Sequence, residues 1–162
     1  MKADSKSPDA NDLLSLITMH TFLKSLAKPH LEVLAASAML KEFARDELIF
    51  REGDPANRFY LIESGSVALE TSKKEKTPAL IEMIGKGDVL GWSWLFPPYY
   101  WHFDARAAET TTAIFFYGIR LREQCEQDHD LGYELMKRMS SVMIHRLQAT
   151  RRKLLETQGA DK

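Results

Sequence analysis

The sequence lacks the features of several protein classes. Cys125 is the single cysteine among 162 residues, so no intrachain disulfide can form. No apolar run approaches the roughly 18 residues of a membrane-crossing helix, and the N-terminal stretch MKADSKSPDAND has no apolar signal core. The 22 Lys and Arg nearly balance the 23 Asp and Glu, which gives a net charge of −1 and no long-range attraction to nucleic acid or anionic membrane. These absences predict a cytoplasmic domain that binds neither nucleic acid nor membrane.

Motifs of catalysis and metal binding are also missing. The five histidines form no HxH or HExxH pattern, and no Cys-x-x-Cys occurs. There is no Gly-x-Ser-x-Gly elbow, no Walker loop and no Rossmann fingerprint. We therefore expect no catalytic residues, no metal site and no enzymatic activity.

The composition and the spacing of apolar residues change along the chain. Residues 1–11 have the composition of a disordered tail, residues 12–157 that of one domain, and 158–162 that of a second tail. LLSLITMHTFLKSL and HLEVLAASAM predict two short helices, with Pro29 in the first turn of the second. Between residues 40 and 117, short apolar runs alternate with turn residues and predict the strands of a sandwich or barrel. KKEK at 73–76 fits a solvated hairpin tip.

The C-terminal quarter predicts one long helix. From residue 120 onward it contains no proline, and apolar residues recur at spacings of three and four. This stripe favours a symmetric homodimer formed by the helix, although it could instead fold back onto its own strands. The predicted dimer residues are Met136, Met139, Met143, Leu147 and Leu154.

Three motifs in order carry a family resemblance. EGDPANRFYLIESGSVAL at 52–69 combines expected turn glycines, Gly53 and Gly65, with alternating apolar residues. With GKGDVLGWSWLF at 85–96 and DARAAETTTAIFF at 104–116, it resembles the cyclic-nucleotide-binding domains of the catabolite-activator type. The resemblance covers about residues 12–156. It implies a mixed α+β fold: a jelly-roll-like antiparallel β-roll with short N-terminal helices and a long C-terminal helix.

The sequence departs from this family at the positions that bind the ribose and the phosphate of the ligand. The resemblance aligns Gly91 with the glycine of the phosphate-binding cassette, but the ribose-binding glutamate that follows it is here Trp92. The phosphate-binding arginine falls on Trp101, and the hydroxyl residue after it on His102. A charge-assisted hydrogen bond contributes about 1.5–3 kcal/mol, so we expect no tight binding of cyclic AMP in the family's usual pose.

The same stretch, GWSWLFPPYYWHFDARA at 91–107, holds all three tryptophans and seven of the sixteen aromatic residues. We predict that it forms a site in which rings stack on a planar ligand and His102 or Arg106 supplies a counter-charge. The rings could alternatively fill the former pocket, or be covered by a protein partner. The predicted ligand-binding residues are Gly91, Trp92, Ser93, Trp94, Trp101, His102 and Arg106.

These patterns together predict a stand-alone regulatory module that binds a nucleotide-like small molecule other than cyclic AMP. Small stand-alone domains of this type resemble accessory subunits of redox complexes such as NAD-reducing hydrogenases. NAD(P)H is therefore a candidate ligand beside the cyclic nucleotides. The alternative function is a ligand-free accessory subunit of a larger, possibly redox, complex.

Overall fold

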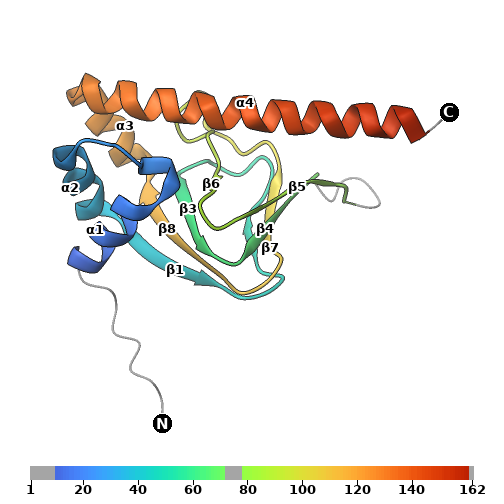
Figure 1. The fold of residues 1–162 in the computed structure, drawn as a ribbon, viewed down its shortest axis with the longest axis horizontal. Coiled ribbons are helices and arrows are strands. Elements are labelled where there is room, and N and C mark those ends of the chain that lie inside the picture. Colours follow the sequence, from blue (N-terminus) through green and yellow to red (C-terminus); the bar gives the residue numbers. More distant parts are fainter. Residues whose placement is uncertain (1–9, 72–77, 161–162) are drawn as a thin grey trace, which may run out of the picture.

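The structure, a computed structural model, describes residues 10–71 and 78–160. The hairpin tip expected at 73–76 lies outside the described residues. Short helices come first, strands follow, and two helices end the chain (Figure 1). The elements are α1 (Ala10–Met19), the 3-10 helix η1 (Thr21–Leu23), α2 (Lys28–Ser37), β1 (Met39–Phe43), β2 (Leu48–Phe50), β3 (Arg58–Ser64), β4 (Ser66–Glu70), β5 (Leu80–Gly85), β6 (Val89–Leu90), β7 (Asp104–Ala107), β8 (Thr111–Tyr117), α3 (Gly118–Gln127) and α4 (His129–Ala160).

The helices at the two ends extend beyond the domain bounds of 12 and 157 expected from the sequence. Helix α1 already begins at Ala10, and Asp12 in its first turn interacts favourably with the helix dipole. Helix α4 continues to Ala160. The long helix is thus confirmed, and Asp128 alone separates it from α3.

The described strands form two antiparallel four-stranded sheets, in the orders β1-β8-β3-β6 and β2-β7-β4-β5. This arrangement confirms the β-roll. The run Phe59-Tyr60-Leu61-Ile62 in β3 is apolar without alternation because both of its faces are buried. Phe59 and Leu61 pack into a cluster with the helices, and Tyr60 and Ile62 pack into a second cluster between the sheets.

Two glycines make the turns that their positions in the sequence predict. Gly53 has a φ of +87° and Gly65 a φ of +90°, in the region that favours glycine. Gly65 also lies against β8, since a Cβ atom there would fall 2.5 Å from Oγ1 of Thr111. Gly65 therefore joins β3 to β4 at a point where no side chain fits.

Helix α4 lies along one side of the roll and runs past it (Figure 1). The apolar stripe expected to form a dimer divides between two environments. Met139 is 0% exposed in the cluster with the helices, so its own core encloses it and it is not available to a second copy. Met136, Leu147 and Leu154 are exposed, and Met143 is half-buried.

Three side chains of α4 bind backbone carbonyls of the rest of the domain. Arg138 donates to the carbonyl of Lys24 at 3.0 Å, and Arg146 to that of Val89 at 3.0 Å. Lys153 donates to the carbonyl of Leu80 at 2.8 Å. The three donors are eight and seven residues apart, about two helical turns, so they share one face of α4.

Within residues 10–71 and 78–160, no helix has both the length and the apolar character that crossing a bilayer requires. The same residues contain no group of three or more His, Cys, Asp or Glu side chains placed to hold a metal ion.

Candidate functional site

The cassette segment, residues 91–107, starts at a glycine whose conformation and surroundings both exclude a side chain. Gly91 has a φ of +90° and directly follows β6. A Cβ atom at this position would lie 2.3 Å from the ring of Trp101. The ring of Trp101 therefore rests on the backbone at Gly91.

The later part of the segment is fixed by backbone hydrogen bonds to residues 53–56. The amide of Gly53 donates to the carbonyl of Trp101 at 2.8 Å, and the amide of Trp101 donates to the carbonyl of Asp54 at 3.0 Å. The amide of Ala56 donates to the carbonyl of Tyr99 at 2.7 Å. These bonds place Trp101 with its side chain directed into the roll.

Trp101 fills the interior between the two sheets. Its side chain is 3% exposed, and its ring stacks on Phe50 with centroids 3.8 Å apart and an interplanar angle of 9°. Phe103 packs against the same Phe50 ring at 5.6 Å. The position that the resemblance assigns to a phosphate-binding arginine is thus occupied by an aromatic stack.

The other two tryptophans lie in different surroundings. Trp94 is 0% exposed and packs against Phe59 at 5.2 Å in the cluster with the helices. Trp92 is half-buried and contacts both core clusters, with its ring 5.8 Å from that of Phe103. The three rings therefore do not form one wall, and only Trp92 borders open space at the cassette.

That open space is a small cavity of about 270 Å³ between the cassette and α4. It brings together three of the predicted site residues, Trp92, Ser93 and His102. Met143, predicted for the dimer, also lines it and connects it to α4. The remaining lining residues are Phe96 and Pro97.

Arg106 is not brought to this cavity. Its neighbours in β7, Ala105 and Ala107, point inward and are fully buried, so Arg106 points out of the roll. There its Nε donates to Glu70 at 3.2 Å and its Nη1 to the carbonyl of Asp46 at 2.9 Å. Arg106 is thus engaged outside the roll, away from the counter-charge role we expected.

Arg58 is a cation that the sequence analysis did not single out. It lies on the same face of β3 as Tyr60 and Ile62, which point into the roll, and its guanidinium sits 4.4 Å from the centroid of the Phe115 ring. Its guanidinium also lies 5.7 Å from the Tyr117 ring, so the side chain is directed toward β8, on the side of β3 away from β6 and the cassette. The sequence contained a signal for the face that Arg58 occupies: it stands two residues before Tyr60, and residues two apart in a strand share a face.

Tyr60, between Arg58 and the roll interior, stays uncharged. Burial is the main influence on its hydroxyl and raises the pKa, and the nearby Arg58 partly opposes this. The interior around Phe50 and Trp101 is therefore lined by uncharged rings.

Comparison with known proteins finds a matching family and similar structures. The family described as the cyclic nucleotide-binding domain matches residues 40–128. The chain is similar to a protein of Geobacter metallireducens classed as cyclic nucleotide-binding, with 28% identity and a TM-score of 0.75 over 82% of this chain and 96% of that one. It is also similar to a cyclic nucleotide-binding domain of Methylobacillus flagellatus, with 17% identity and a TM-score of 0.75 over 91% and 83% of the two chains.

A third similar structure is the regulatory subunit of a cAMP-independent protein kinase A from Trypanosoma brucei. It has 21% identity and a TM-score of 0.67 over 82% of this chain and 47% of that one. No curated protein sequence matches the chain.

Proposed function

The chain belongs to the cyclic nucleotide-binding domain family, and from this premise we propose that it is a regulatory module whose cassette binds a planar ligand other than cyclic AMP. The kinase subunit of Trypanosoma brucei, which has the same fold, is described as cAMP-independent. The fold by itself therefore does not require a response to cyclic AMP.

The observation that carries this proposal is the ring of Trp101 between Phe50 and Gly91. A cyclic nucleotide in the roll interior would have to displace it. Exposing the 150–250 Å² that a buried tryptophan covers costs about 4–6 kcal/mol at 25 cal/mol per Å². That cost lowers an affinity by about three to four decades. The missing arginine would weaken phosphate binding further.

The cavity beside Trp92 is where a ligand has room. Its volume of about 270 Å³ lies just below the roughly 300–1,000 Å³ of sites for drug-sized molecules. A single ring such as a base or a nicotinamide suits this size, with Trp92 as its stacking surface and His102 at its edge. Because Arg106 is engaged outside the roll, His102 is the residue of this cavity left to supply a counter-charge for an attached anionic group.

Helix α4 is the element that we propose carries the effect of ligand binding to a second copy of the chain. Met143 lines the cavity, so a ligand there touches the helix directly. The exposed side chains Met136, Leu147 and Leu154 then offer a surface for a second copy. We propose that α4 forms a homodimer through these residues and transmits ligand binding to it.

Calorimetry with the full chain tests the proposal. The titrants are cyclic AMP, adenine, nicotinamide mononucleotide and NADH, and the variant is Trp92→Ala. Loss of one stacking surface should weaken binding by about a decade or more. Trp94→Phe is the matched control, because Trp94 is fully buried away from the cavity and its replacement should leave the affinity unchanged.

Two results would contradict the proposal. Submicromolar binding of cyclic AMP to the unaltered chain would show that Trp101 does not close the interior. No heat with any titrant, together with a partner protein that shields Trp92, would favour the ligand-free accessory subunit.

A further inference from the structure

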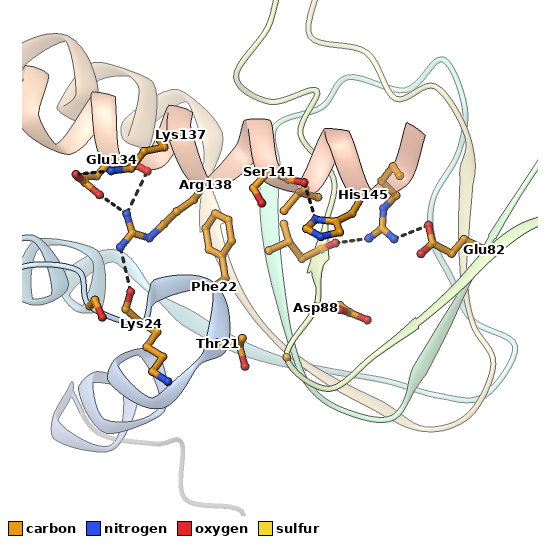
Figure 2. A pocket seen from close by; sticks show the side chains of 15 residues that line it. Thr21, Phe22, Lys24, Glu82, Asp88, Glu134, Lys137, Arg138, Ser141 and His145 are labelled. Carbon is orange, nitrogen blue, oxygen red and sulfur yellow. Dashed lines mark hydrogen bonds and ion pairs between the residues drawn. The ribbon is translucent and has the colours of Figure 1, made fainter. Parts of the chain in front are cut away.

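A second and larger cleft lies between α4, η1 and the turn from β5 to β6 (Figure 2). Its volume is about 860 Å³, within the range of small-molecule sites. Its lining residues come from 21–25, 82–89 and 134–146, so it is separate from the cassette.

Two arginines of α4 connect the walls of this cleft. Arg138 forms an ion pair with Glu134 and donates to the Lys24 carbonyl at 3.0 Å. Arg146 pairs with Glu82 at 2.6 Å and donates to the Val89 carbonyl at 3.0 Å. Both side chains are about 85% buried, with 15% and 14% exposed. The pair thus fixes the walls, and the buried Nε of Arg146 is left without a partner among the described residues.

The groups around Arg138 make one end of the cleft positive. Lys24, Lys137 and Arg138 are three cations against the single carboxylate of Glu134. The Lys137 side chain is 57% exposed and pairs with Glu134 at 3.3 Å. The Lys24 ammonium has no partner among the residues that the structure describes. Figure 2 shows the two ammonium groups on opposite sides of the Arg138 guanidinium, so an anionic group would meet one or the other.

The end around Arg146 is negative. Asp88 and Glu82 are two carboxylates against one guanidinium. One oxygen of Asp88 accepts from the Gly85 amide at 2.9 Å, which leaves the other for a ligand. His145 faces Asp88 from the α4 side of the cleft (Figure 2). Its Nδ1 donates to the Ser141 carbonyl at 2.8 Å, so the neutral ring offers Nε2 as a further acceptor.

An apolar surface connects the two ends. Phe22 stands between the Arg138 and His145 ends, and Val89 and Val142 also line the cleft (Figure 2). Phe22 is held in place by an edge contact with Phe59 at 5.4 Å and by a hydrogen bond from its amide to His20 at 3.2 Å. The body of a ligand would pack on this preformed surface. The arginines at its ends are eight residues apart, about 12 Å along α4.

We propose that this cleft is a second ligand site, which takes an elongated small molecule with an anionic group for Lys24 or Lys137 and an amino group for Asp88 and His145. The site does not depend on the cassette. Both a short zwitterionic peptide and an aminopurine nucleotide have this chemistry.

Calorimetry on the full chain distinguishes these two sources. The probes are trialanine, which spans about 10 Å when extended, adenosine monophosphate, and inosine monophosphate, which carries a carbonyl in place of the amino group. Binding of trialanine alone assigns a peptide ligand, and binding of adenosine monophosphate alone assigns a nucleotide. Inosine monophosphate should bind at least about tenfold more weakly than its adenosine analogue, because the carbonyl that replaces the amino group accepts and cannot donate to Asp88.

Variants place the bound probe in the cleft. Asp88→Asn keeps an acceptor for the Gly85 amide but removes the charge, and the double variant Lys24→Gln/Lys137→Gln removes both surface cations. Each should weaken binding about tenfold or more. Lys28→Gln, at an exposed lysine of α2 outside the cleft, should change the affinity less than about twofold. Trp92→Ala should also leave this binding intact, which separates the cleft from the cassette.

The proposal is overturned if neither trialanine nor adenosine monophosphate binds at millimolar concentration. It is equally overturned if both cleft variants bind the probe as the unaltered chain does. Equal binding of the adenosine and inosine compounds would refute the contact with Asp88.

Discussion

Replacing Trp101 by alanine tests whether this ring is the structural plug of the roll. The side chain is 3% exposed, stacks on Phe50 at 3.8 Å and rests on Gly91. Truncation of a tryptophan in such a site costs about 3–5 kcal/mol in free energy of unfolding. That is a large part of the 5–15 kcal/mol of a typical domain. Urea unfolding followed by circular dichroism measures the loss.

The cavity that the truncation leaves should accept the missing ring. An apolar cavity of this kind stays dry and binds small aromatic molecules. Indole at a hundred times its dissociation constant should restore about 2.7 kcal/mol to the variant. It should stabilise the unaltered chain far less, since Trp101 already occupies the space.

Trp92→Ala is the comparison variant. Trp92 is only half-buried, so its truncation should cost clearly less than that of Trp101. A loss below about 1 kcal/mol for Trp101→Ala would refute the packing argument. So would equal stabilisation of both proteins by indole.

Three further predictions concern other parts of the molecule. The pKa of His20 is lowered, mainly by burial and against the opposing effects of the Ile62 carbonyl and Asp88. The stability that this neutral ring contributes is thus complete above its unfolded pKa of about 6.5 and falls as the pH drops below it. Urea unfolding at pH 7.5 and 5.5 should show this loss in the unaltered chain and a smaller one in His20→Asn. Leu147, 70% exposed on α4, should contribute to the dimer, so Leu147→Glu should give a monomer by light scattering while leaving the free energy of unfolding nearly unchanged. A monomeric unaltered chain would contradict the dimer. Burial, followed by the charges of Glu126 and Asp128, raises the pKa of Cys125 to about 11. Its alkylation by iodoacetamide at pH 8 should therefore be about a hundredfold slower than that of a thiol with a pKa of about 9, and a rate within tenfold would refute this.

The parts of the fold that local patterns encode were predictable. The positive φ of Gly65, the strand at 59–62 and the long C-terminal helix each depend on residues close together in the sequence. Arg106 shows a pattern that was available and not used. The small residues Ala105 and Ala107 on either side of it mark the inward face of β7, so alternation alone directs Arg106 outward.

The cassette and the large cleft depend on distant contacts that no local pattern contains. Tryptophan is equally suited to a core and to a stacking site, so the sequence alone did not show that Trp101 would pack on Phe50 while Trp94 joined the other cluster. The cleft arises only when Lys24 and Arg138 meet through a backbone carbonyl. That meeting depends on how α4 docks, which is a property of the whole fold.

The three bonds from Arg138, Arg146 and Lys153 to backbone carbonyls give α4 a single register. Moving a helix by one residue turns its side chains by about 100°, so such a slip would break all three bonds at once. Small sliding movements are therefore excluded, and α4 is either fully docked or released along this face. Because the acceptors are backbone atoms, substitution of the Lys24, Val89 or Leu80 side chain leaves the three hydrogen bonds in place. The side chains that fix this register therefore all belong to α4.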